Sequence, residues 1–132
     1  MENAVLDSYA VLAFLFKEKG HEIMLDLFEE ALEADNKLLV AAPNWAEVRY
    51  MVERKVGASR WAEVRARLLG LPLNIIEADQ ELAEVAGEIK AFHKMSLADC
   101  FAAALARLKK AEIYTGDPEF RAIEAEQKIV WL

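Results

Sequence analysis

The chain has 132 residues, of which 55% are hydrophobic and 30% charged, the proportions of a folded domain and not of a disordered segment. Its net charge of −7 argues against general polyanion binding, because attraction to phosphates needs Lys and Arg. The short apolar stretches and the single Cys100 predict one cytoplasmic domain over residues 1–132, without membrane attachment or an intramolecular disulfide.

Apolar runs and helix-start signals alternate along the chain and predict strands separated by helices. In the first half we expect a strand over 4–6, helices over 7–16 and 23–32, a strand over 37–42 ended by Pro43, and helices over 44–55 and 60–69. In the second half we expect a strand over 72–77, helices over 79–93 and from 96, a strand over 112–115, a short helix opened by Asp117, and a strand over 128–132. This order predicts an α/β fold of three layers, with helices on both faces of a five-stranded, mostly parallel sheet.

Four acidic residues stand where these helices begin: Asp7, Glu47, Asp99 and Asp117. Asp7, Glu47 and Asp117 each lie just past the end of a predicted strand, and Asp99 lies at the start of the helix that leads into the strand over 112–115. Ligands of parallel α/β sheets bind at the carboxyl ends of the strands, so the four acids meet at one edge if their strands are neighbours. Four carboxylates in one small pocket need a cation, and Mg²⁺ or Mn²⁺ prefers such oxygen ligands.

Helix capping is the alternative explanation for the same acids. Segments 44–47 and 96–99 each match a capping box or a close variant of it. Asp7 and Asp117 stand where N-cap residues are expected, the latter directly before a proline. Capping predicts four separate sites, whereas metal binding requires one shared site.

The pentapeptide Trp-Ala-Glu-Val-Arg occurs twice, at 45–49 and at 61–65. Five residues are too few for a structural repeat, but the duplication offers two candidates for the second acid, Glu47 and Glu63. Glu47 lies in the first turn after a predicted strand, whereas Glu63 follows a corner between two helices. We therefore select Glu47.

Four segments resemble the PIN-domain ribonucleases, and more narrowly the VapC-type toxins of toxin–antitoxin pairs. They are 5–13 (VLDSYAVLA), 45–48 (WAEV), 96–104 (SLADCFAAA) and 115–120 (TGDPEF), which occur in the family's order and spacing. The resemblance implies a five-stranded sheet in which strands one, two and four are central and the acids meet at their carboxyl edge.

The resemblance further implies that Asp7, Glu47, Asp99 and Asp117 are catalytic residues that bind Mg²⁺ or Mn²⁺, and that Thr115 supplies a nearby hydroxyl. The expected activity is endoribonuclease cleavage of RNA phosphodiester bonds, with a VapB-like antitoxin as partner. Two alternatives are a PIN-like nuclease of RNA processing that has no antitoxin, and a non-catalytic α/β interaction module.

Residues outside the acid motifs are candidates for contacts with RNA or with partner proteins. Ser8, Lys94 and Arg49 are candidate substrate contacts, and Arg49 begins a basic stretch over 49–67. The helices over 44–69 carry two tryptophans that belong either to plain core packing or to a groove for an antitoxin or a second subunit. We expect a homodimer, or a hetero-oligomer with the antitoxin.

Overall fold

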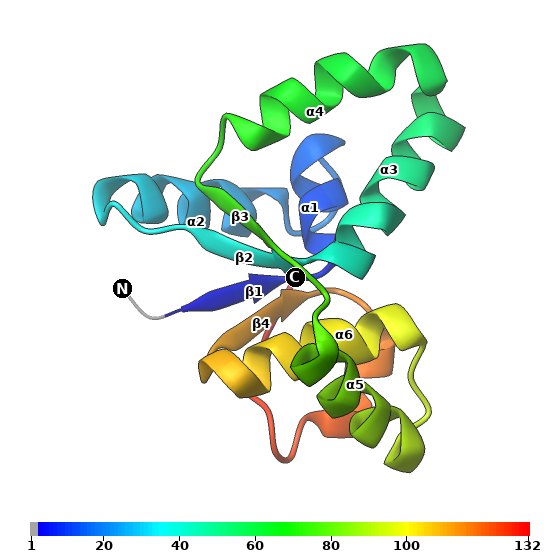
Figure 1. Ribbon diagram of the computed structural model, residues 1–132. Helices are drawn as coiled ribbons and strands as arrows, with labels where there is room; N and C mark the ends of the chain where they lie inside the picture. The colour runs from blue at the N-terminus through cyan, green and yellow to red at the C-terminus, as the bar shows by residue number, and fades with distance from the viewer. Residues whose placement is uncertain (1–2) are drawn as a thin grey trace.

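The computed structural model describes residues 3–132, which form one five-stranded sheet between two layers of helices (Figure 1). All strands are parallel, and their order is β3-β2-β1-β4-β5. Strands one, two and four are therefore central, as predicted. The bounds of the strands are β1 Ala4–Leu6, β2 Leu38–Ala41, β3 Leu73–Ile76, β4 Glu112–Thr115 and β5 Ile129–Trp131.

The helices divide between the two faces of the sheet, and each face has its own hydrophobic core. The first four α-helices cover one face, and α5, α6 and the 3₁₀ helix η2 cover the other (Figure 1). Their bounds are α1 Ser8–Leu15, α2 His21–Glu33, α3 Ala42–Val56, η1 Ala58–Arg60, α4 Trp61–Leu69, α5 Gln80–Phe92, α6 Leu97–Lys109 and η2 Pro118–Ile123. The predicted three-layer α/β/α fold is thus confirmed.

The local sequence explains why the central elements are buried. Every residue of β1 and β2 is buried, as expected for parallel strands covered on both faces. Helix α6 buries a run of small residues, Ala102–Ala106 apart from Leu105, which lets it lie close to the sheet.

Among residues 3–132, no helix is both long and apolar enough to cross a bilayer.

The start of α3 differs from the sequence prediction. Pro43 is not the residue that ends β2; it is the second residue of α3. Backbone N–H groups in the first turn of a helix have no partner within the helix, so the N–H that proline lacks costs no hydrogen bond. The N-cap is Ala41, which makes no side-chain capping bond. Asn44 is therefore the third residue of the helix, and the predicted capping box over 44–47 is wrong.

Candidate active site

The acidic residues are brought together by the ends of β1 and β4 and by the starts of α3 and α6. Strands β1 and β4 are hydrogen-bonded neighbours, with Leu6 opposite Tyr114. Asp7 follows the first of these strands, and Asp117 follows the second by two residues. Helix α6 packs against both β1 and β4, which places Asp99 of its first turn at the same edge.

Asp7 is 1% exposed and is held from two sides. Its Oδ1 accepts a hydrogen bond from the backbone N–H of Ala10 at 2.9 Å, which makes it the N-cap of α1. Its Oδ2 accepts a hydrogen bond from Thr115 Oγ1. The same hydroxyl oxygen accepts the backbone N–H of Asp117 at 2.9 Å. Thr115 therefore connects the first and last acids of the predicted site.

Asp99 is 4% exposed, and its carboxylate does not cap its helix. The capping arm from Ser96 is present, because Asp99 N–H donates to Ser96 Oγ at 3.3 Å. In a capping box the Asp99 carboxylate would in turn accept the backbone N–H of Ser96. Here that N–H donates instead to Glu119 Oε1 at 2.7 Å. Asp99 Oδ2 is left buried without a hydrogen-bond partner in the described part of the chain. Capping therefore does not explain this carboxylate.

Burial and mutual repulsion raise the pKa values of two acids in the site. The pKa of Asp7 is raised to about 7, mainly by burial, although the bonds from Thr115 and Ala10 oppose the shift. The pKa of Asp99 is raised to about 8 by burial, and then by the charges of Asp117 and Asp7. The charge of Glu47 also raises the pKa of Asp7. The four predicted acids therefore share one electrostatic environment, which a cation or protons must neutralise.

Glu47 lies on α3 and is oriented by hydroxyl groups. Its Oε1 accepts a hydrogen bond from Ser8 Oγ at 3.0 Å, and its Oε2 accepts one from Tyr50 at 3.4 Å. Its twin in the duplicated pentapeptide, Glu63, instead pairs with Arg60 at 3.1 Å, and its side chain is 61% exposed. The two copies thus occupy different environments, and only Glu47 lies near Asp7.

A further acid, Glu119, belongs to this cluster and was absent from the sequence prediction. One carboxylate oxygen from each of Asp99, Asp117 and Glu119 lies within 4.8 Å of the others. Asp117 Oδ1 also accepts the N–H of Glu119 at 2.9 Å and so caps η2. The unpaired buried oxygen of Asp99 and this set of hard oxygen donors fit a divalent cation such as Mg²⁺ or Mn²⁺.

The sequence profile of the PIN domain family matches residues 4–126. This chain belongs to the PIN domain family. No curated protein sequence matches it.

Solved structures share the fold of this PIN domain at low sequence identity. VapBC2 from Rickettsia felis, bound to a DNA fragment from its promoter, has a TM-score of 0.77 and 16% identity, with 98% of each chain covered. DNA-bound VapBC from Salmonella typhimurium has a TM-score of 0.76 and 18% identity, again with 98% of each chain covered. Mycobacterium tuberculosis VapC20, a toxin that cleaves the sarcin–ricin loop, has a TM-score of 0.70 and 17% identity, with 95% of this chain and 96% of that chain covered.

The predicted substrate contacts lie in three different environments in this PIN domain. The Ser8 hydroxyl is at the acidic site, bonded to Glu47. Lys94 is exposed in the loop that leads into α6. Arg49 is exposed on α3, where it pairs with Glu53 at 2.9 Å and lies 5.7 Å from the ring centre of Trp61. A role for these side chains in holding RNA stays a prediction.

Other side chains of the predicted basic stretch also have partners within the chain. Lys55 pairs with Glu18 at 3.4 Å, and the Arg54 guanidinium lies 4.7 Å from the ring centre of Tyr50. Such exposed pairs are weak, so they do not prevent contacts with phosphates. The ion pair of Lys55 with Glu18 offsets part of the positive charge that the sequence suggests for this surface, whereas the contact of Arg54 with the neutral Tyr50 ring does not.

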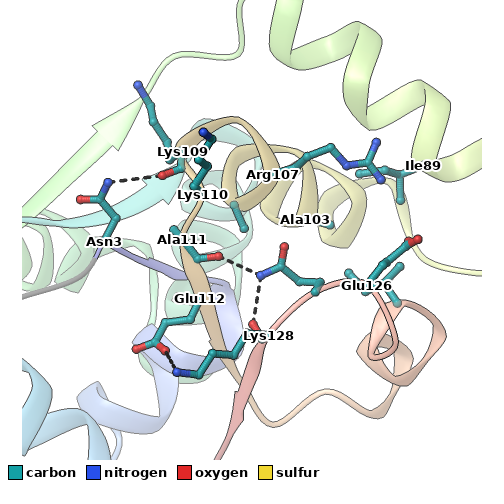
Figure 2. A pocket seen from close by; sticks show the side chains of 13 residues that line it. Asn3, Ile89, Ala103, Arg107, Lys109, Lys110, Ala111, Glu112, Glu126 and Lys128 are labelled. Atoms are coloured by element: carbon teal, nitrogen blue, oxygen red, sulfur yellow. Dashed lines mark hydrogen bonds and ion pairs between the residues drawn. The ribbon is translucent and has the colours of Figure 1, made fainter.

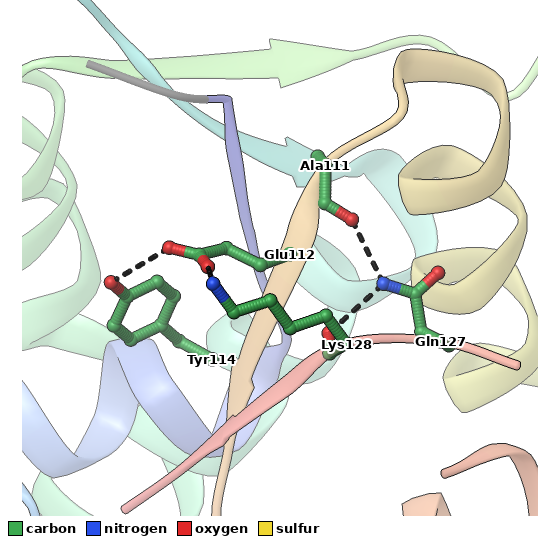
Figure 3. A network of polar contacts seen from close by, with 5 residues as sticks. All are labelled: Ala111, Glu112, Tyr114, Gln127 and Lys128. Atoms are coloured by element: carbon green, nitrogen blue, oxygen red, sulfur yellow. Dashed lines mark hydrogen bonds and ion pairs between the residues drawn. The ribbon is translucent and has the colours of Figure 1, made fainter. Parts of the chain in front are cut away.

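A cavity of about 920 Å³ lies at the opposite end of the PIN domain sheet, where β4 begins (Figure 2). Gln127 Nε2 donates to the carbonyl oxygens of Ala111 and Lys128, at 2.8 and 3.0 Å, and Lys128 pairs with Glu112 at 2.9 Å (Figure 3). These bonds connect the ends of α6, β4 and β5 to one another. The cavity is therefore separate from the acidic site, and Gln127, Lys128 and Glu112 at its lining are held by these contacts.

Gly116 separates Thr115 from Asp117, and its Cα hydrogen faces the Tyr9 ring of α1. A Cβ at this position would lie 2.8 Å from the Tyr9 hydroxyl oxygen and closer still to two ring carbons. We expect Gly116→Ala to destabilise the protein by about 1–3 kcal/mol, because the ring has to move. Gly87→Ala is the matched control: its Cβ meets nothing within 4 Å in α5, so a stabilisation of about 0.5–1 kcal/mol is expected. Urea unfolding measures both, and equal effects would contradict the tight Tyr9 contact.

Proposed function

We propose that this chain, as a single PIN domain, is a metal-dependent endoribonuclease that acts as the toxin of a toxin–antitoxin pair. The observation that carries the proposal is the buried acid cluster at the carboxyl edge of the sheet, with a raised pKa at Asp7 and at Asp99. Family membership and the fold shared with VapC20, a toxin that cleaves the sarcin–ricin loop, support RNA as the substrate class.

Asp7, Glu47, Asp99 and Asp117 would hold Mg²⁺ or Mn²⁺, and Glu119 is close enough to contribute through the same cluster. When bound, such an ion neutralises charge on the phosphate oxygens and lowers the pKa of a coordinated water. The protein's own part is to keep the carboxylates desolvated and crowded, so that they favour a cation over water.

Neighbouring side chains fix the orientation of the acids. The Thr115 hydroxyl holds Asp7 Oδ2, and the Ser8 hydroxyl holds Glu47 Oε1 at 3.0 Å. The two histidines serve elsewhere, since His21 Nδ1 lies 3.1 Å from the carbonyl oxygen of Phe14 and His93 lies 3.3 Å from a carboxylate oxygen of Glu126. Cleavage by this chain would therefore depend on carboxylates and bound metal, with no histidine as base.

The proposed antitoxin contact lies on the hairpin of α3 and α4. Trp61 is buried, and its ring lies 5.5 Å from the half-buried Trp45 ring, so this pair serves mainly as core packing. Exposed apolar side chains on the same two helices include Tyr50, Met51 and Leu69. Because the structural neighbours include VapBC complexes, we propose that a VapB-like antitoxin segment, or a second copy of the chain, covers them.

The proposed activity predicts that the purified protein cuts RNA in the presence of Mg²⁺ or Mn²⁺ and that EDTA stops the reaction. The panel should contain tRNA and structured rRNA fragments, with DNA of the same sequence as the control substrate. No cleavage of any RNA under these conditions would contradict the proposal.

The duplicated pentapeptide supplies matched variants for the same assay. We expect Glu47→Gln to reduce cleavage about a hundredfold or more, because it removes one charge beside Asp7. Glu63→Gln makes the same chemical change on the exposed face of α4, and we expect its cleavage rate to stay within about twofold of wild type. Equal rates for the two variants would contradict the assignment of Glu47 to the site.

A further inference from the structure

Asn44 is a fully buried polar residue in the contact between α3 and α6. Its side-chain Nδ2 donates a hydrogen bond to the backbone carbonyl of Ala98 at 3.2 Å, directly before Asp99 in the chain. It also precedes Glu47 by three residues on α3, so both side chains project from the same face of that helix. Asn44 therefore lies between two of the acids of the site.

The oxygen of the Asn44 side-chain amide, Oδ1, has no hydrogen-bond partner in the part of the chain that the structure describes. Within residues 3–132, the buried side-chain polar atoms without a hydrogen bond are Asn44 Oδ1 and Asp99 Oδ2. The orientation of the amide is set by Ala98, since only the NH₂ group can pair with a carbonyl oxygen. Buried acceptors are nearly always satisfied, so Oδ1 requires a donor that residues 3–132 do not supply.

We propose that Asn44 is a positioning residue of the acidic site, whose Oδ1 accepts a hydrogen bond from a water molecule held there with the metal. This inference rests on the metal dependence proposed above. Mg²⁺ keeps several of its waters when it binds a protein, and neighbouring hydrogen-bond acceptors orient them. A carboxamide oxygen can do this without adding another negative charge beside Asp99 and Glu47.

Mn²⁺ titration of the Asn44→Leu variant tests the proposal without using RNA. Leucine fills a similar volume but accepts no hydrogen bond, so we expect the dissociation constant for Mn²⁺ to rise about tenfold or more. The matched control is Gln127→Leu at the far end of the sheet, which also removes a hydrogen bond from a side-chain amide to a backbone carbonyl (Figure 3). We expect that variant to lose stability and to bind Mn²⁺ within about twofold of wild type.

Mn²⁺ affinity of Asn44→Leu equal to that of wild type would overturn the proposal and leave Asn44 as a structural tie between two helices. If Asn44→Leu does not fold, the same titration on Asn44→Ala decides the question by the same criterion. A wild-type protein that binds Mn²⁺ but cuts no RNA would contradict the proposed function alone. Failure of the Asn44 inference and failure of the nuclease activity are therefore distinguishable.

Discussion

Asp99→Asn should reduce RNA cleavage about a thousandfold and, at the same time, make the metal-free protein more stable. The loss follows because the substitution removes a charge that stabilises the bound cation, and metal assistance contributes several kcal/mol to such reactions. The gain follows because burial and the charges of Asp117 and Asp7 disfavour the Asp99 carboxylate, whereas a neutral amide avoids both costs. We expect the melting temperature in EDTA near pH 8 to rise by about 3–8 °C.

Asp79→Asn is the control for this prediction. Asp79 is exposed and caps α5, because its Oδ1 accepts a hydrogen bond from the backbone N–H of Leu82 at 2.9 Å. Asparagine is an equally good N-cap, so we expect neither cleavage nor stability to change appreciably. An Asp99→Asn protein that cuts RNA at the wild-type rate, or that melts below wild type in EDTA, would contradict the interpretation of Asp99 as a metal ligand whose negative charge is disfavoured when no metal is bound.

Acidification should stabilise the metal-free protein between about pH 8.5 and about pH 5.5. The pKa values of Asp7 and Asp99 are raised to about 7 and about 8 in the folded state, from the ordinary aspartate value of 3.8. In this range the folded state binds more protons than the unfolded state, so the free energy of unfolding falls as pH rises. We expect the free energy of unfolding to fall by up to about 5 kcal/mol as the pH rises across this range, because both groups titrate within it, and urea unfolding in EDTA measures the change.

Saturating Mg²⁺ should reverse this dependence. A cation replaces the protons, so its stabilising effect should be largest near pH 8 and small near pH 5.5. Asp99→Asn should show a shallower pH dependence in EDTA and a smaller Mg²⁺ increment than wild type. An Mg²⁺ increment that is the same at both pH values, or the same in the variant, would mean that the buried acids and the metal do not share a site.

The position of Asp7 and Asp117 at one edge of the sheet could be predicted, because each follows a strand and the carboxyl ends of parallel strands lie at the same edge. The strand order could not be predicted from residue patterns, because it depends on which strands pair across long stretches of chain; resemblance to a known family supplied it. The observed order β3-β2-β1-β4-β5 agrees with that resemblance. Capping and clustering also proved compatible, since Asp7 and Asp117 cap helices and lie in the shared electrostatic environment.

The residues that sequence reasoning missed depend on contacts between distant segments. Asn44 matches a capping box in the sequence, but Pro43 lies inside α3, at a position where proline is common, so the helix begins before Asn44. Glu119 was overlooked because its bond to the N–H of Ser96 joins segments 23 residues apart. Only the spacing from Asp117 to Glu119 at the start of η2 could have indicated a second acid there.

The most direct test of a shared metal site is a crystal structure of the protein soaked in Mn²⁺, with anomalous diffraction used to locate the metal. We predict anomalous density among Asp7, Asp99 and Asp117 in wild type, and much weaker density in Asp99→Asn crystals treated in the same way. Density only at exposed surface acids, or equal density in both proteins, would contradict the proposal that these carboxylates form one metal-binding active site.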